Sequence, residues 1–199
     1  MAGTLSAVLG DQQTVYGKIA VTPKPSSRFQ VEKEIHRMPA ITDPHIGFVS
    51  FQEALRAGTI RPAPCASHPE LYVLHDTPEP GTQRLTYAFV TDSLAKAYAV
   101  YVLAEPLNGR PCFGVGYATD AEYRGQGLAT DLVKASMAEL EKSLAPKLLS
   151  PGFYVEAIVG ADNAASKKVA TRTLSETPKS TKDKESGHPA LQYVKLLGC

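Results

Sequence analysis

The apolar residues of this chain change their spacing once, and two glycines mark the change. In the segment that ends at Thr119 they alternate with small or polar residues, which is typical of β-strands. From Leu128 to Leu144 they recur every three to five positions, which is typical of an amphipathic helix. Gly125 and Gly127 lie between the two patterns, and glycines this close together allow a tight turn and close approach to a ligand. The sequence therefore predicts a strand, a tight loop and a helix in direct succession.

The loop and the helix that follows it have the chemistry of an anion site. The first turn of a helix presents N–H groups without helical partners at the positive end of the helix dipole, and phosphates bind readily there. Arg124 adds a positive charge that stays protonated in proteins. The segment from Asp120 to Thr130 therefore predicts binding of a phosphate or a diphosphate.

Other phosphate-binding and catalytic motifs fit this chain less well. A dinucleotide-binding G-x-G-x-x-G motif requires a third glycine where this chain has Thr130, and Gly114 and Gly116 lie inside a predicted strand. The sequence contains neither the G-x-x-x-x-G-K-[ST] motif of P-loop proteins nor the G-x-S-x-G motif of serine hydrolases. The order of the predicted strands also argues against a dinucleotide-binding fold.

The second half of the chain has the pattern of a sheet with two helices. The strands expected before the glycine loop are 71–74, 84–90, 97–103 and 112–119. Asn108-Gly109 favours a hairpin because both residue types tolerate positive φ angles, so these strands should form an antiparallel meander. The elements expected after the long helix are a strand at 153–159 parallel to the fourth strand, a short helix at 163–170, a mobile loop at 177–187 and a closing strand at 191–197.

The first 68 residues carry weaker signals. Thr14–Val21 fits a strand, and the segment from Phe29 to Ile35 fits a strand or a helix equally well. We expect residues 1–68 to be an N-terminal elaboration packed on the same domain. Residues 69–199 should form its core.

One helix is predicted within this N-terminal part. Ser50-x-x-Glu53 has the form of a capping box, in which two side chains satisfy the first free N–H groups of a helix. The residues after it favour a helix, and Gly58 is a typical stop. We therefore expect a short helix that begins at Ser50.

The glycine loop resembles the signature of the GNAT superfamily of acetyl-CoA-dependent N-acetyltransferases. Arg124–Ala129 matches its [QR]-x-x-G-x-[GA] pattern, and Asn163–Ser166 is similar to its Asn-x-x-Ser helix start. The resemblance covers about residues 70–197. It implies an α/β (α+β) fold with a mixed, mostly antiparallel sheet of about six or seven strands flanked by helices. It also implies that a primary amine attacks the thioester of acetyl-CoA directly and takes up its acetyl group.

The resemblance further implies which residues bind acetyl-CoA as the cosubstrate. The end of the fourth strand would bond the pantetheine arm, the loop N–H groups would hold the pyrophosphate, and the Asn-x-x-Ser segment would contact the pantetheine or the thioester. The residues concerned are Tyr117, Ala118, Thr119, Arg124, Gly125, Gln126, Gly127, Leu128, Ala129, Thr130, Asn163 and Ser166. Asn and Ser in the last segment fit a simple helix-capping role as well.

The acid and the base of the reaction stay open, because the chain departs from the family pattern. Ala170 stands where the family often has a tyrosine, and the fourth strand lacks a glutamate that is sometimes found there. The candidates for catalytic residues are Tyr117, Glu156 and His188, in that order. Each has an ordinary alternative as a packed aromatic residue, a solvated strand residue or a loop residue.

The composition narrows the partners and the compartment. The formal net charge is +1, which gives no overall attraction to nucleic acid or anionic membranes, and no apolar run is long enough to span a bilayer. Three scattered cysteines argue against a disulfide framework and favour a cytoplasmic protein. Cys65, His68 and His75 match no common zinc spacing, so we expect no metal. The expected partner is a small-molecule or peptide amine, and a homodimer is left open.

A second function class is consistent with the same motifs. A non-catalytic module of the GNAT fold would bind an acyl-CoA as a sensor or a structural ligand, and the missing tyrosine and glutamate favour it. The two classes differ in one observable property, because a sensor leaves acetyl-CoA intact and an enzyme releases free coenzyme A.

Overall fold

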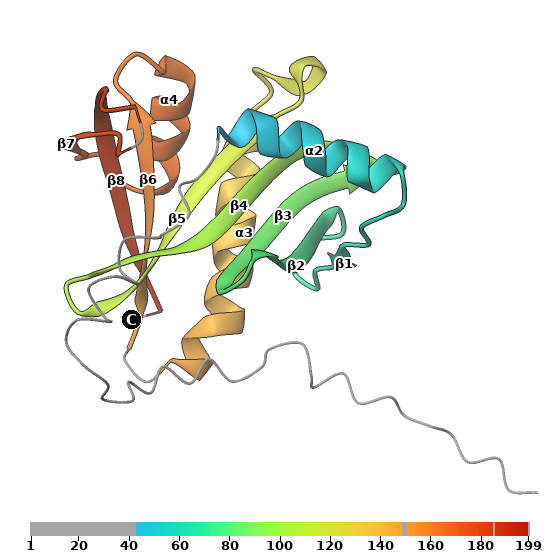
Figure 1. Cartoon of the computed structure of the whole chain (residues 1–199), viewed down its shortest axis with the longest axis horizontal. Coiled ribbons are helices and arrows are strands. Elements are labelled where there is room, and N and C mark those ends of the chain that lie inside the picture. The colour runs from blue at the N-terminus through green and yellow to red at the C-terminus, as the bar shows by residue number, and fades with distance from the viewer. Residues whose placement is uncertain (1–42, 149–150, 185, 199) are drawn as a thin grey trace, which may run out of the picture. The chain divides into compact units, whose positions relative to one another are not determined.

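The computed structural model describes residues 43–148, 151–184 and 186–198. Within these ranges the chain forms one eight-stranded sheet with helices on both of its faces (Figure 1). The segments predicted at 14–21 and 29–35 lie outside the described residues.

The sheet is mixed, and only one neighbouring pair of strands is parallel. The strands are β1 (Ala63–Pro64), β2 (Leu71–Glu79), β3 (Thr82–Thr91), β4 (Leu94–Leu107), β5 (Arg110–Thr119), β6 (Phe153–Gly160), β7 (Lys179–Lys182) and β8 (Pro189–Leu197). Their order across the sheet is β1-β2-β3-β4-β5-β6-β8-β7, and only β5 and β6 run parallel. The predicted fold class is confirmed. The described part of the chain has eight strands rather than six or seven, because β1 and β7 pair with its edges.

The predicted meander of four strands is present as β2 to β5. Asn108 and Gly109 connect β4 to β5 with φ angles of +49° and +74°, which is the left-handed geometry that this pair of residues was expected to supply. The hairpin places the end of β5 directly before the glycine loop.

One face of the sheet is covered by the two helices that flank β6. α3 (Leu128–Leu144) buries Leu132, Val133 and Leu140 in the main core, and α4 (Ala164–Thr173) packs on the same side. The hydroxyl groups of Tyr101 on β4 and Ser136 on α3 form a buried hydrogen bond of 2.7 Å. This contact fixes α3 on the sheet, and with it the start of the helix near the glycine loop.

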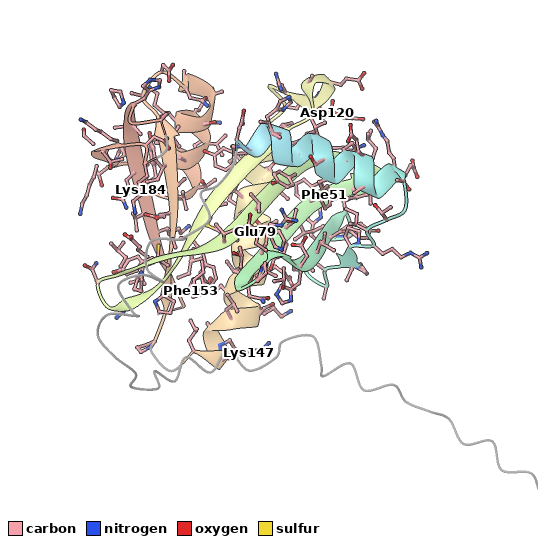
Figure 2. All side chains as sticks on the ribbon, in the orientation of Figure 1. Phe51, Glu79, Asp120, Lys147, Phe153 and Lys184 are labelled. Atoms are coloured by element: carbon pink, nitrogen blue, oxygen red, sulfur yellow. The ribbon has the colours of Figure 1, made fainter. Side chains whose placement is uncertain are left out.

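The opposite face is covered by α2 (Pro44–Arg56). Phe48 and Phe51 are buried between this helix and the sheet, where both rings contact Tyr98 of β4. Figure 2 shows Phe51 beneath the helix. This second, smaller core lies over β3, β4 and β5. The α2 helix therefore extends across the sheet to the strand that precedes the glycine loop.

The predicted start of this helix was wrong. α2 begins at Pro44 with Asp43 as its N-cap, so Ser50 lies in the middle of the helix and caps nothing. An Asp-Pro pair supplies a capping carboxylate and a proline whose φ angle suits the first helical position. That signal outweighs the Ser-x-x-Glu spacing, which also occurs inside helices. The predicted stop is confirmed, since Gly58 has a φ angle of +67° just beyond the helix end.

The mobile loop predicted at 177–187 was also wrong in part. Lys179–Lys182 forms β7, which pairs antiparallel with Pro189–Gln192 of β8. β7 is a short edge strand whose four residues are lysine, serine or threonine. Such a strand has no alternation of apolar residues to reveal it, and charged residues on an edge discourage pairing with other chains.

Candidate functional site

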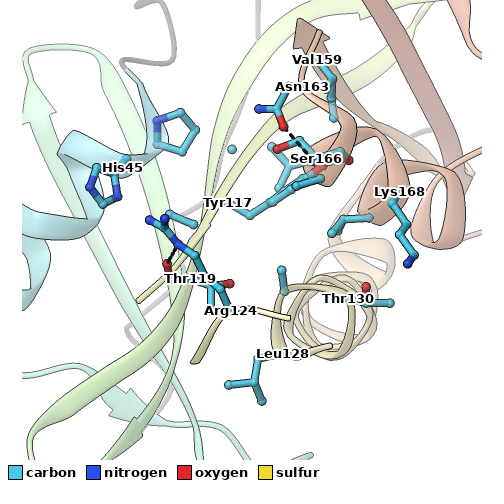
Figure 3. Close-up of a pocket in the computed structure, with 18 of the residues that line it drawn as sticks. His45, Tyr117, Thr119, Arg124, Leu128, Thr130, Val159, Asn163, Ser166 and Lys168 are labelled. Atoms are coloured by element: carbon cyan, nitrogen blue, oxygen red, sulfur yellow. Dashed lines mark hydrogen bonds between the residues drawn. The ribbon is translucent and has the colours of Figure 1, made fainter. Parts of the chain in front are cut away.

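The parallel strands β5 and β6 separate soon after they meet. They pair only at Cys112–Gly114 and Tyr154–Glu156, although β5 continues to Thr119 and β6 to Gly160. Their facing edges beyond this point therefore carry backbone groups without a strand partner. A cavity of 720 Å³ opens there, within the size range of small-molecule sites (Figure 3).

The glycine loop forms one end of this cavity. Asp120 caps a 3₁₀ turn at Ala121–Tyr123 by accepting a hydrogen bond of 3.0 Å from the Glu122 N–H. Gly125 and Gly127 then take φ angles of +76° and +86°, and Gly127 is the N-cap of α3. Glycine reaches this left-handed region without steric cost, whereas a side chain disfavours it.

A run of backbone N–H groups is left free at the start of α3. The Arg124 N–H donates to Ala121, and the N–H groups of Thr130 and Asp131 donate to the Gly127 carbonyl. Between these, the N–H groups of residues 125–129 donate no hydrogen bond within the described part of the chain. Gly127 has no side chain to cap the helix. Within the segment from Arg124 to Thr130, whose N–H groups were predicted to hold a phosphate, five residues therefore have a free N–H group.

Cationic side chains from two elements line the same cavity. Arg124 comes from the loop, and Lys168 and Arg172 come from α4. The Arg124 Nε atom donates to the Thr119 carbonyl at 3.3 Å, which ties the loop to the end of β5. Positive charge and free N–H groups together suit a phosphate-bearing ligand.

Several other predicted ligand residues line the cavity. Tyr117, Ala118 and Thr119 are contributed by β5, and Asn163 and Ser166 by the start of α4. Asn163 is the N-cap of α4, and its Oδ1 atom accepts a hydrogen bond of 2.9 Å from the Ser166 N–H. The capping role is therefore present in the structure. Asn163 and Ser166 nevertheless face the cavity as well.

The residues of the loop itself fall into two groups. Arg124, Gly125, Leu128, Ala129 and Thr130 line the cavity together with Gly127. Gln126 does not line it, and its side-chain amide donates to the Glu122 carbonyl at 3.2 Å. Gln126 therefore supports the loop through its side chain and offers only its backbone N–H.

The three candidates for catalysis are not brought together. Tyr117 lines the cavity, but its hydroxyl donates to the Ser166 carbonyl at 2.7 Å. Glu156 lies at the last pair between β5 and β6, and it does not line the cavity. Its Oε2 atom accepts a hydrogen bond of 2.6 Å from the side chain of Gln192. His188 is exposed in the connection between β7 and β8 and does not line the cavity.

The chemistry of Tyr117 is set by its burial. Loss of solvent raises the pKa of its hydroxyl well above the usual value, and the bond to Ser166 offsets this in part. The single proton of the hydroxyl is engaged by the Ser166 carbonyl, so Tyr117 forms a structural hydrogen bond between β5 and α4.

Sequence analysis missed the residues that α2 contributes. Asp43, Pro44 and His45 line the cavity from the face of the sheet opposite α3. The Asp-Pro pair could have indicated the helix start. No local pattern, however, indicates that the helix begins beside the end of β5, because that depends on packing of Phe48 and Phe51 against Tyr98 of β4, which is distant in the sequence.

Metal sites and membrane spans were sought in the same residues. The described ranges contain no group of three or more His, Cys, Asp or Glu side chains that could hold a metal ion. Among the helices of the described residues, none is both long and apolar enough to cross a bilayer.

Comparison with known proteins gives matches among solved structures alone. No family model and no curated protein matches the chain. A ribosomal L7/L12 alpha-N-protein acetyltransferase in complex with coenzyme A is 21% identical over 58% of this chain and 63% of its own, with a TM-score of 0.44. An acetyltransferase of the GNAT family from Streptococcus pneumoniae is 13% identical over 58% and 67%, with a TM-score of 0.44. A ribosomal-protein-S5-alanine acetyltransferase from Vibrio fischeri is 16% identical over 59% and 62%, with a TM-score of 0.43.

All three of these proteins are acetyltransferases, and the family that the Arg124–Ala129 signature resembles is named among them. The chain spans less than two thirds of the length of the first and the third.

Proposed function

We propose that this chain is an N-acetyltransferase that transfers the acetyl group of acetyl-CoA to a primary amine of a small molecule or a peptide. The observation that carries the proposal is the run of five free N–H groups, residues 125–129, at the mouth of a gap between two parallel strands. Residues 69–199 would form the transferase core, as the sequence predicts.

The donor set fits acetyl-CoA. The free N–H groups of the loop and the Arg124 guanidinium would hold the pyrophosphate, because both are donors at a positive helix end. The unpaired edge of β5 from Val115 to Thr119 offers N–H and C=O groups to the amide bonds of the pantetheine arm. Lys168 and Arg172 supply further positive charge for phosphate groups.

When bound, acetyl-CoA would supply a thioester whose carbonyl carbon an amine can attack. The protein would contribute by positioning the two reactants and by excluding water, which are large effects in reactions between two molecules. Tyr117 would not act as the acid. It would instead keep β5 and the start of α4 at a fixed separation through its bond to Ser166.

The first test is calorimetric titration of the full chain with coenzyme A and with acetyl-CoA. A Gly127→Glu variant places a carboxylate in the expected pyrophosphate site and should weaken binding at least about tenfold, or about 1.4 kcal/mol. Gly81→Glu is the matched control, because Gly81 has the same φ angle of +86° in the turn between β2 and β3, where an added Cβ meets nothing within 4 Å. Equal binding by both variants would contradict the proposed site.

The second test separates an enzyme from a binding module. Free thiol is measured while acetyl-CoA is incubated with the protein and a panel of alkylamines, amino sugars and peptides with free N-termini. Release that depends on both protein and amine supports the transferase. Tight binding without release would indicate the alternative, a non-catalytic acyl-CoA-binding module.

A further inference from the structure

The N-termini of α2, α3 and α4 all face the cavity, and those of α3 and α2 have opposite chemistry. At α3 the N-cap is Gly127, and the first N–H groups are free. At α2 the Asp43 carbonyl accepts from the N–H groups of Ile46 and Gly47 at 2.9 and 3.3 Å. The Asp43 Oδ1 atom accepts from the His45 N–H at 3.0 Å. The α2 end is thus closed to anions, whereas the α3 end is open to them.

The side chains follow the same division. The cations that line the cavity come from the loop and from α4, whereas α2 contributes a carboxylate and an imidazole. A phosphate-bearing ligand therefore fits the α3 and α4 side. The α2 side offers negative charge and a proton acceptor, which suits an amine that arrives as a cation.

His45 is the proton acceptor that the cavity leaves available. It is exposed, and neither of its ring nitrogens forms a hydrogen bond within the described ranges. In Figure 3 its ring lies on the α2 side, apart from Ser166 and Lys168 on the α4 side. It is the one imidazole among the described residues that line the cavity.

The other lining groups are less suited to this task. The Tyr117 hydroxyl is already bonded to Ser166, and the arginine and lysine side chains are hydrogen-bond donors without an acceptor atom. Asp43 uses its carboxylate to cap α2. Glu156 and His188 do not line the cavity.

We propose that His45 is the general base, and that the acceptor amine enters from the α2 side; this rests on the proposed transferase function. One ammonium proton passes to a ring nitrogen of His45 and then to solvent. The neutral nitrogen forms a C–N bond with the thioester carbonyl carbon, and the C–S bond breaks. A second proton leaves the nitrogen and ends on the sulfur of coenzyme A, so that an amide and a free thiol result.

The test compares wild type with His45→Gln, using ethylamine and hydroxylamine as acceptors at neutral pH. Ethylamine is protonated there and needs a base, whereas hydroxylamine is largely neutral and needs none. With ethylamine, the variant should lose about 100-fold in kcat, the scale of general base catalysis. With hydroxylamine it should lose less than about tenfold, and binding of coenzyme A should change less than about twofold. His75→Gln is the control, because His75 is exposed on β2 and does not line the cavity.

A further variant tests proton transfer itself. His45→Ala should regain part of its activity with ethylamine when free imidazole is added, which a purely structural role would not allow. Equal losses of kcat with both acceptors, or no recovery of activity with imidazole, would overturn the role of His45. Neither result would contradict the proposed transferase function. A wild type that binds coenzyme A and acetylates neither acceptor would overturn both proposals. A wild type that binds no coenzyme A would overturn the site itself.

Discussion

The hydroxyl of Tyr117 donates a hydrogen bond of 2.7 Å to the carbonyl of Ser166, so a side chain of β5 reaches the helix that follows β6. These two elements lie on either side of the gap where β5 and β6 separate. The contact therefore helps to define the width of the cavity. It also occupies the single proton of the hydroxyl, which is why Tyr117 is better regarded as a positioning residue.

Replacing Tyr117 with phenylalanine tests this role. The change removes one partly buried hydrogen bond, so the free energy of unfolding should fall by about 1 kcal/mol. Affinity for coenzyme A should fall a few-fold, and kcat should fall by less than about tenfold, since no proton transfer is lost. Urea denaturation, calorimetry and thiol release measure the three quantities. A fall of about 100-fold in kcat with unchanged affinity would instead support Tyr117 as the acid.

The close contact between Gly47 and Tyr98 makes a second prediction. A Cβ atom on Gly47 would lie 2.5 Å from the Tyr98 hydroxyl oxygen, so Gly47→Ala should shift α2 and cost about 1–3 kcal/mol of stability. Tyr98→Phe removes that oxygen. In this background the same Gly47→Ala change should stabilise by up to about 1 kcal/mol, because alanine favours a helix over glycine. Chemical denaturation of the four proteins forms a double-mutant cycle, and purely additive effects would contradict the clash.

Asn163 allows the capping and binding roles to be separated. Asn163→Ala removes the hydrogen bond to the Ser166 N–H and should cost about 0.5–2 kcal/mol of stability. Asn163→Ser keeps a capping oxygen and should restore most of this loss. If Asn163 also contacts the ligand through its amide, both variants should bind coenzyme A more weakly than wild type. If instead Asn163→Ser binds coenzyme A as well as wild type does, and only Asn163→Ala binds it more weakly, capping is the whole role of Asn163.

Two buried thiols predict how stability depends on alkaline pH. Burial raises the pKa of the Cys65 thiol to about 11 and that of Cys112 to about 12, and nearby glutamates add to this. Above pH 9.0, which is the ordinary pKa of a cysteine thiol, the unfolded chain loses these protons, whereas the folded state retains them. This contribution is complete below pH 9 and is lost as the pH rises through 11 to 12.

Urea denaturation at about pH 8 and about pH 10.5 measures the effect. The free energy of unfolding of wild type should fall between the two, and the Cys65→Ala and Cys112→Ala variants should each lose less over the same interval. Only the change in the free energy of unfolding between the two pH values is compared. The stability that each variant loses because alanine is smaller than cysteine is present at both values and therefore cancels. Identical pH dependence in all three proteins would contradict the raised pKa values.

The sequence predicted the elements whose signals are local. Gly125 and Gly127 indicated the turn into α3, and Asn108-Gly109 indicated the β4–β5 hairpin, because each depends on φ angles that few residues adopt. The order of strands and helices followed from the change of apolar spacing. The free N–H groups at the start of α3 could be predicted because a helix start and its N–H groups are properties of a short segment.

The rest of the candidate site depends on packing between distant segments. His45 faces the cavity only because α2 crosses β4 and β5, and no nearby residue indicates this. The direction of the Tyr117 hydroxyl depends on α4, 49 residues away. β7 escaped prediction because a polar edge strand has no apolar face to bury.

Because β5 and β6 pair over so few residues, two halves of the sheet are joined by few backbone hydrogen bonds. Three residue pairs are the whole seam between a five-stranded half and a three-stranded half. A ligand strung along the gap would act as a missing strand and lengthen that seam. The main core already joins the two halves through α3, so occupancy of the gap would add backbone hydrogen bonds to that shared packing and raise the free energy of unfolding of the whole sheet.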